Sequence, residues 1–557
     1  MAPQLQINQG PQDALLFDNT RSYFTNVGYT RTSNFQMELR DVDPQNTANL
    51  GGTVNFVIPK AADLLGPVDL MIKFNPASAA PGAGKIQGWV EALGHAMIEK
   101  ITFSVGSHDI ETLTGDHLNI MNELMRSDAQ RYGFPHTLKT GRPLAVGEIG
   151  SSANAFSWYT DGETDESVCV DRLIGAGSTI KDGKSLIIPL GLFFTTHPSK
   201  YFPLAAIAGS NDVRISVKFR TLNELLVLKG SPTVSGTTMT ATTAFSDAGI
   251  PTFANGSAFV QGSGCFLRCH YIHVTGPEAT ALMNREHVRL MKLWSGNEVS
   301  KQFTVTCTPN GTADTLDIDL SFLHPVQELV ITIRKVSDMG SSVNSNIAPG
   351  TGAKPTVMTA STKNYFAYHG SGRGDPNVES IANSVEGDVG GMHDATYLKT
   401  KTFTLKINGQ SRHLDGQGID RDYLMNRLMP MLHSNASSNL ENLVETSYIS
   451  GIGNHAPAGK PDGINDWKML KELVDRKEIY VYPFALNPEG ANPSGSVNFS
   501  KVSHAKLTIA VDGLLGKERD GTDQSSGTAT EDFQVDVYGV YYNWLAIKDG
   551  RALTSFA

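Results

Sequence analysis

Four side chains of the kind that bind soft metals lie close together in the sequence: Cys265, Cys269, His270 and His273. Thiolates and imidazoles are the ligands that zinc prefers, so a metal site is the first chemistry to test. In an extended strand Cys265, Cys269 and His273 share a face, but four residues at ~3.3 Å each put neighbours ~13 Å apart. Zinc needs its ligands at ~2.0–2.3 Å, and a disulfide needs Cα atoms within ~7 Å. We therefore expect neither a metal nor a disulfide here, unless the segment curls.

Two glycine-rich segments could hold a phosphate. Gly177 to Ser185 reads GSTIKDGKS, with five residues between its glycines where the P-loop has four. Leu186 to Pro189 then reads as a strand, whereas a P-loop must run into a helix. Gly370 to Gly374 lacks a flanking strand and helix, so we interpret it as a flexible loop. Neither segment predicts a nucleotide site.

Catalytic patterns are also missing from the sequence. It contains no G-x-S-x-G elbow and no H-E-x-x-H helix. His95 and His108 have no carboxylate at metal-ligand spacing, and Asp317 and Asp319 alternate with apolar residues, which is typical of solvated charges on a strand. We therefore predict no catalytic, cofactor-binding or metal-binding residues, and a protein that is not an enzyme.

Some short motifs match sites used by extracellular proteins. Arg373-Gly374-Asp375 spells an adhesion tripeptide, but three-residue matches arise by chance and a turn is the better interpretation. The N-x-S/T pattern occurs at four positions, which we expect to stay unmodified in a cytosolic protein. These positions are Asn255, Asn310, Asn435 and Asn498.

Composition indicates a well-buried globular protein. Of the 557 residues, 40% are hydrophobic and 18% charged, and the formal net charge is −10. No block of Lys and Arg is present, so we expect no direct contact with nucleic acid. Four cysteines favour a reducing compartment. Residues 1–22 lack a secretory pattern, and Leu186 to Phe194 is half the ~20 residues that span a bilayer.

The elements that must position any site are mainly strands. Val213, Ile215, Val217 and Phe219 alternate with polar residues, so one face of this segment is buried and the other is wet. The same alternation recurs at 54–58, 101–105, 316–320, 329–333, 403–407, 507–511 and 533–537. With 54 glycines and 26 prolines to make turns, the pattern predicts an all-β protein of two antiparallel sandwiches.

Helices and loops are expected to be secondary features. Asp116 is a candidate N-cap for a helix through Met125, Asp466 for one through Val474, and a third helix is predicted at 279–293. We interpret all three as short connecting helices. Residues 230–263 and 337–395 are rich in Gly, Ser and Thr or Asn, which predicts long surface loops.

Segments along nearly the whole chain resemble the double jelly-roll major capsid proteins of nucleocytoplasmic large DNA viruses. The similar segments are YTRTSNF at 29–35, IEKITFSVGSHDIETLTGDHLNI at 98–120, SLIIPLGLFFTTHPSKYFPLAAIAGSNDVRISVKF at 185–219, LHPVQEL at 323–329, LKINGQSRHL at 405–414, YVYPFALNPEGANPSGSVNFSKV at 480–502 and VYGVYYNWLAIKDG at 537–550. Lys501 stands where the family usually has Arg, and the long loops look like insertions.

The resemblance implies two tandem jelly rolls with a few short connecting helices and long surface loops. We expect an N-terminal arm at 1–22, jelly rolls at 23–221 and 222–547, and a C-terminal tail at 548–557. Insertions are expected at 230–263, 337–395 and 435–475.

It also implies a homotrimeric, pseudo-hexameric capsomer that tiles an icosahedral shell in the virion after assembly in the host cytoplasm. The expected partners are further copies of the chain, neighbouring capsomers and minor capsid proteins. A viral inner membrane could lie nearby without insertion of the chain.

Two other classes of function remain open on the sequence alone. A cupin-like metalloprotein or enzyme could share the fold, but the His-x-His pair of cupins is absent. A carbohydrate-binding or adhesion protein would use the loop that contains Arg373-Gly374-Asp375, and a secretory signal would favour it.

Overall fold

The computed structural model describes most of the strand framework. The described residues are 34–75, 85–90, 93–125, 173–174, 186–230, 233–235, 238–240, 258–260, 262, 264–284, 286–295, 299–306, 314–336, 365–366, 368, 397–413, 417–433, 479–515 and 530–555.

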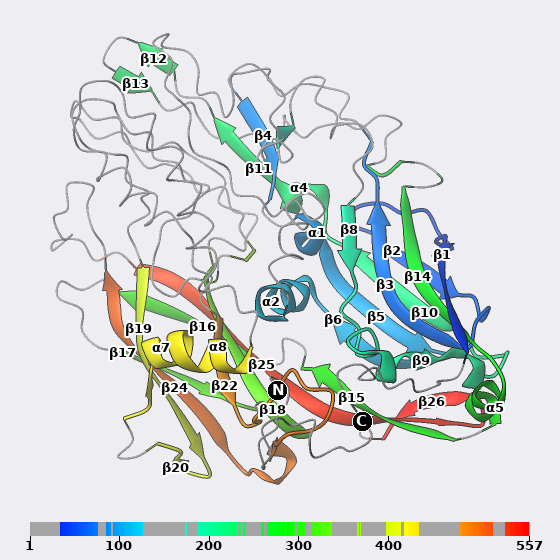
Figure 1. Cartoon of the computed structure of the whole chain (residues 1–557). Helices are drawn as coiled ribbons and strands as arrows, with labels where there is room; N and C mark the ends of the chain where they lie inside the picture. The colour runs from blue at the N-terminus through cyan, green and yellow to red at the C-terminus, as the bar shows by residue number, and fades with distance from the viewer. Residues whose placement is uncertain are drawn as a thin grey trace, which may run out of the picture.

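The first sandwich consists of two antiparallel sheets (Figure 1). One sheet has the order β1-β14-β3-β8, with β9 also paired to β3. Its strands are β1 (Phe35–Val42), β14 (Cys265–Val274), β3 (Leu64–Ile72), β8 (Leu186–Pro189) and β9 (Phe202–Pro203). The other has the order β2-β10-β5-β6. Its strands are β2 (Thr53–Ile58), β10 (Val213–Phe219), β5 (Ile98–Val105) and β6 (His108–Leu113).

Period-two burial makes these sheets amphipathic, as predicted. In β10 the side chains of Val213, Ile215, Val217 and Phe219 are fully buried, and the residues between them are exposed or half-buried. Aromatic rings fill the space between the two sheets: Phe103 lies 5.2 Å from Phe194 and 5.3 Å from Phe202 between ring centroids. Interdigitation from both inner faces is what holds a sandwich together.

The second sandwich repeats the design. Its larger sheet has the order β15-β25-β18-β22, and β16, β23 and β26 also join it. These strands are β15 (His287–Trp294), β16 (Val299–Thr306), β18 (Pro325–Lys335), β22 (Ile479–Pro483), β23 (Val497–Asn498), β25 (Thr530–Lys548) and β26 (Arg551–Thr554). The smaller sheet contains β17 (Asp314–Asp319), β24 (Ala505–Leu515), β19 (Tyr397–Ile407), β20 (Gln410–Ser411) and β21 (Ile419–Asp420).

The order of pairing identifies both sandwiches as jelly rolls. In each, the first strand pairs with a strand from near the C-terminal end of that sandwich, and this late strand also pairs with an early one, as β1-β14-β3 and β15-β25-β18. The facing sheets share an order as well, as β2-β10-β5 and β17-β24-β19. Such interleaving is the double Greek key of a jelly roll, so the predicted all-β fold with two tandem jelly rolls is confirmed.

The division between the sandwiches differs from the expected one at 221/222. Strand β14 pairs with β1 from Phe35↔Val274 to Val42↔Leu267, and it also pairs with β3. Residues 265–274 therefore complete the first jelly roll, whereas the expected boundary places them in the second. Local sequence could not indicate this, because the partner strands lie some two hundred residues earlier in the chain.

The prediction of a helix at 279–293 is wrong in its second half. Helix α5 spans Pro277–Asn284, and β15 begins at His287 and pairs with β25. The apolar residues of this segment fit both the helical and the strand period. The segment forms a strand because its backbone hydrogen-bonds to β25. The helix expected from Asp466 lies outside the described residues.

The remaining elements are short. They are β4 (Lys85–Trp89), α1 (Leu93–Ala96), α2 (Gly115–Met125), β7 (Leu173–Ile174), η5 (Pro198–Lys200), η6 (Leu204–Ala206), α4 (Leu222–Leu225), β11 (Leu226–Gly230), β12 (Thr233–Ser235), β13 (Thr238–Thr240), α7 (Arg421–Tyr423), η9 (Leu424–Leu428), α8 (Met429–Leu432) and η12 (Phe499–Lys501). Within the described part of the chain, no helix is long and apolar enough to cross a bilayer.

Parts of the two predicted surface loops are buried. Phe259, within 230–263, is 2% exposed and forms a bridge with Phe74. Tyr365, Phe366 and Tyr368, within 337–395, are at most 5% exposed. These apolar anchors fix the loops to the core, so the prediction of pure surface loops was wrong at both places. The insertion expected at 435–475 lies outside the described residues.

Candidate functional site at the seam between the two sandwiches

Helix α2 of the first sandwich faces the second sandwich. Thr114 takes the N-cap position, where its Oγ1 accepts a hydrogen bond from the His117 backbone N at 3.5 Å. A Cβ on Gly115 would lie 2.3 Å from the His95 carbonyl oxygen, so only glycine allows this close approach. Asp116 is the second residue of the helix and not its cap, which corrects our expectation. Its carboxylate is free to point across the seam.

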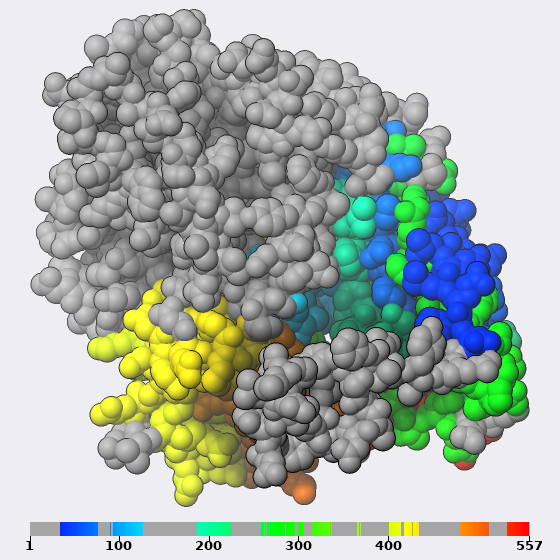
Figure 2. Space-filling view, viewed as in Figure 1, coloured from blue at the N-terminus to red at the C-terminus, as the bar shows by residue number. Residues whose placement is uncertain are grey.

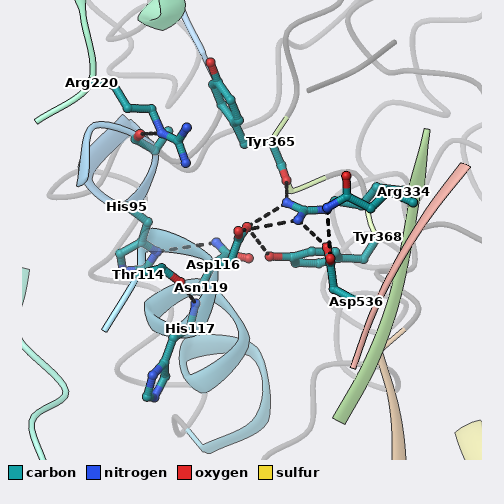
Figure 3. Close-up of polar contacts among 12 residues, drawn as sticks. His95, Thr114, Asp116, His117, Asn119, Arg220, Arg334, Tyr365, Tyr368 and Asp536 are labelled. Carbon is teal, nitrogen blue, oxygen red and sulfur yellow. Dashed lines mark hydrogen bonds and ion pairs between the residues drawn. The ribbon is translucent and has the colours of Figure 1, made fainter. Parts of the chain in front are cut away.

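Arg334 of β18 forms an ion pair with the carboxylate of Asp116 (Figure 3). Its Nη1 lies 2.7 Å from Asp116 Oδ1, and its Nη2 lies 2.5 Å from Asp536 Oδ2 on β25. Nη1 also donates to the Tyr365 carbonyl oxygen at 2.8 Å, and the Tyr368 hydroxyl donates to Asp116 Oδ1 at 3.1 Å. One guanidinium thus joins both sandwiches and the loop after β18. We call these five residues the seam network.

Burial makes the seam network a strong electrostatic contact. The side chains of Arg334, Asp116 and Asp536 are 4%, 7% and 1% exposed. Burial opposes charge on Arg334, but the carboxylates of Asp116 and Asp536 outweigh it and hold the pKa of the guanidinium above its ordinary value. Burial, followed by the Asp116 charge, raises the pKa of the Tyr368 hydroxyl. Arg334 therefore stays positively charged, and the Tyr368 hydroxyl keeps its proton.

Ring stacking extends the seam along α2. The His117 ring stacks on Trp294 of β15 with centroids 4.2 Å apart and an interplanar angle of 25°. Burial lowers the pKa of His117 to about 3, so the ring is neutral. Arg220 of the first sandwich donates to the Ala96 carbonyl oxygen, and its guanidinium carbon lies 4.4 Å from the ring centroid of Tyr365. The seam is thus apolar and aromatic around its ionic centre.

The C-terminal hairpin adds a second link between the sandwiches. Strands β25 and β26 are joined by Asp549 and Gly550, both with positive φ, as a type I′ hairpin requires. The Gly550 carbonyl oxygen accepts from the Ala208 backbone N at 3.0 Å and from Asn211 Nδ2 at 2.8 Å. The last strand of the second jelly roll is therefore tied to the first.

A separate buried ion pair lies inside the second sandwich. His433 Nε2 is 3.0 Å from Glu328 Oε2, and His433 Nδ1 is 3.3 Å from Glu489 Oε1. Burial lowers the pKa of His433, but hydrogen bonding and the charges of Glu328 and Glu489 raise it to about 9. The imidazolium therefore fixes the C-terminal end of α8 to β18.

The candidate metal residues do not form a cluster. Cys265 and Cys269 are buried free thiols on the core side of β14, and burial raises both pKa values to about 12. His270 lies 3.8 Å from Asp69, whereas His273 pairs with Glu38 at 3.0 Å. Among the described residues no three His, Cys, Asp or Glu side chains are arranged to hold a metal ion.

The other candidate residues are dispersed. His95 is buried beside Asn119, and His108 is exposed at the start of β6. Asp317 is partly exposed and pairs with Lys506 at 2.6 Å, which confirms a solvated strand face. Asn498 Oδ1 accepts from the Ser500 backbone N. Segments 177–185 and 370–375, with Asn255, Asn310 and Asn435, lie outside the described residues.

Our reading of the sequence missed the seam network. Arg334 and Asp536 are charged residues inside apolar strands, LVITIRK at 329–335 and FQVDVYGV at 533–540, and this interruption was a usable signal. The sequence predicts Asp116 as a helix cap, because Asp is common there. Which charges meet across the seam depends on how two distant sheets pack.

Family models match both ends of the chain. Residues 22–253 match the family described as major capsid protein N-terminus, and residues 466–552 match the large eukaryotic DNA virus major capsid protein family. The major capsid protein of Phaeocystis pouchetii virus is 24% identical, over 97% of this chain and 96% of its own length. That of Paramecium bursaria Chlorella virus 1 is 22% identical, over 98% and 97%.

Solved structures agree on the fold. The PBCV-1 protein VP54, in a crystal structure fitted into a reconstruction of the virophage Sputnik, superposes with a TM-score of 0.55 at 16% identity. The match covers 96% of this chain and all of that one. A quasi-atomic model of the PBCV-1 capsid gives the same TM-score at 17% identity. With two jelly rolls of matching strand order and both family models in place, the chain belongs to the double jelly-roll major capsid proteins of nucleocytoplasmic large DNA viruses.

Proposed function

We propose that this major capsid protein assembles as a homotrimer whose six jelly rolls form a pseudo-hexagonal capsomer. Such capsomers would tile the icosahedral shell of the virion. The observation that carries the proposal is the repetition of one strand order twice in a single chain. Three copies about a threefold axis then give six similar corners from one gene product.

The seam supports this role because a capsomer corner must be rigid. The seam network and the hairpin at Gly550 fix one jelly roll against the other through buried contacts. A flexible pair of sandwiches would present varying angles to its neighbours, and a regular lattice would not close. A fixed pair meets its next copy head to tail, and a rotation of 120° closes the ring.

We propose a purely structural role, with no catalytic residues, no cofactor and no direct contact with nucleic acid. The partners would be two further copies, neighbouring capsomers and minor capsid proteins beneath the shell, with a viral inner membrane nearby. Assembly would occur in the host cytoplasm. The jelly-roll boundary would fall after residue 274, with a polar arm at 1–22 that contacts neighbours from inside the shell.

Light scattering of the purified chain tests the assembly. A trimer should weigh three times the 60.1 kDa of one chain, about 180 kDa. An obligate interface, which buries ~2,000–5,000 Å², should keep this mass on dilution. Electron microscopy of the trimer should then show six-cornered particles. A folded chain that stays at 60.1 kDa at every concentration would refute self-assembly as the function.

A further inference from the structure

Two groups of exposed apolar side chains lie on different sandwiches. Phe35, Met37 and Leu39 of β1 are 68%, 55% and 55% exposed. Because successive strand residues alternate, the three share one face. Tyr423 and Met431 of the helical segment α7–η9–α8 are 53% and 58% exposed. We call the first group the β1 patch, and Tyr423 and Met431 together with Arg427 the helix patch.

The β1 patch lies on an edge strand. Among the described residues β1 pairs only with β14, so its second edge is open, and its first seven residues are all exposed. Opposite the patch, Ile272 and Val274 are buried together with Leu282 of α5. A long open edge with large apolar side chains invites pairing and aggregation, so proteins cover such edges.

The helix patch is the outer stripe of an amphipathic segment. Leu424, Met425, Met429 and Leu432 are buried against the second sandwich. Tyr423, Arg427 and Met431 are spaced by four residues, so they line up on the opposite, exposed side. Tyr, Arg and Met are the residue types enriched in protein–protein interfaces.

The two patches lie on opposite flanks of the chain. In Figure 1, β1 is at the right edge of the first sandwich, and α7 and α8 lie on the second sandwich at the left, with α2 between them. Figure 2 shows the same separation at the surface, with the blue β1 region at the right and the yellow helical segment at the lower left. A head-to-tail ring needs two different surfaces placed in this way.

We infer that the β1 patch of one copy packs against the helix patch of the next copy around the ring. This inference rests on the proposed trimer and names its contact. Charge also fits: on the face of the β1 patch Asp41 and its partner Arg268 on β14 are exposed, and Asp422 and Arg427 are exposed on the helical segment, so each surface offers both signs. Opposite charges would set the register while the apolar side chains bury.

Cysteine pairing tests the contact directly. In the Met37→Cys, Met431→Cys double variant, mild oxidation should link copies into covalent dimers and trimers. Strand β1 and helix α8, which carry the two positions, lie on different flanks of one chain, so a bond between them joins two copies. Each single variant should stay unlinked, as should a Val288→Cys, Met431→Cys control, because Val288 is 65% exposed but outside both patches.

A charge substitution gives an independent readout. Met37→Asp should raise the concentration at which half of the chains are trimeric by about tenfold or more. Val288→Asp, at a similarly exposed position, should leave it unchanged. Suppose that the wild type is trimeric, the double-cysteine variant forms no specific cross-links, and Met37→Asp trimerises as well as the wild type. This result would overturn the inference and leave the proposed function standing. That is also the result expected if residues 1–33 of the same chain cover β1. A monomeric wild type would overturn both.

Discussion

Replacing Arg334 should destabilise the fold far more than replacing an exposed arginine that forms a similar ion pair. The Arg334→Met substitution keeps the apolar stem but leaves the Asp116 and Asp536 carboxylates buried beside each other. Removing one partner of a buried ion pair destabilises a protein by ~3–5 kcal/mol, because the remaining charge is uncompensated. The second carboxylate places the expected loss near the upper end.

Arg214 is the matched control. Its Nη2 lies 2.8 Å from Asp212, close to the 2.7 Å of the Arg334–Asp116 pair, but both side chains are 47% exposed. Water screens this pair, so Arg214→Met should reduce the free energy of unfolding by ~0–1 kcal/mol. The two variants thus compare the loss of unfolding free energy for a buried and an exposed Arg–Asp pair of nearly the same length.

Urea unfolding followed by circular dichroism measures both variants against the wild type. A loss for Arg334→Met within ~1 kcal/mol of that for Arg214→Met would refute the assignment of the seam network as a stabilising contact. A third chain carries Arg334→Met, Asp116→Asn and Asp536→Asn together. Because it removes the uncompensated charges, it should be more stable than Arg334→Met alone. If it is less stable, electrostatics do not explain the effect.

Three further predictions concern the same links. Gly550→Ala would put a Cβ 2.4 Å from Ala208 Cβ, whereas Gly409→Ala, also at positive φ, meets nothing within 4 Å; thermal unfolding should show Gly550→Ala as the less stable by ~1–3 kcal/mol, and equal losses would exclude a hairpin clash. The pKa of His117 is about 3 when folded and 6.5 when unfolded, so the unfolded chain gains a proton first as the pH falls. From pH 7 to 5 the wild type should therefore lose ~2 kcal/mol more than His117→Phe in urea titrations, and parallel losses would contradict a buried neutral ring. The pKa of His433 is about 9 when folded, so its stabilisation is full below 6.5 and is lost as the pH rises. From pH 7 to 9 the wild type should lose ~2 kcal/mol more than His433→Gln, and no difference would mean that the Glu328 pair is weak.

Strand positions were largely predictable from the sequence. Val213 to Phe219 alternates cleanly and forms β10 with its apolar residues fully buried. Such a segment has one face against a core and one in water, so local pattern alone is sufficient. The predicted helix wrongly includes His287 to Trp294, because the apolar residues of this segment fit a helix equally well. The strand β25, with which it pairs, lies about 250 residues later in the chain.

Side-chain partners across the seam were much less predictable. The carboxylate of Asp116, the guanidinium of Arg334 and the ring of Tyr368 come from three separate parts of the chain. Tyr368 lies in a segment whose composition indicates a surface loop, yet it is fully buried. Local composition indicates the average exposure of a segment. The burial of a single side chain such as Tyr368 depends instead on which residues of another domain pack around it.

The pairing of first and last strands sets an order on synthesis. Strand β1 must wait for β14 before its sheet can form, and β15 and β16 must wait for β25. The ribosome therefore releases more than two hundred residues before each sandwich can close, and the seam forms only after Asp536 has emerged. A polypeptide terminated before residue 530 would lack the central strand of its second sandwich. A truncated chain of this kind cannot complete the second jelly roll, because β15, β16 and β18 would all lack their shared partner.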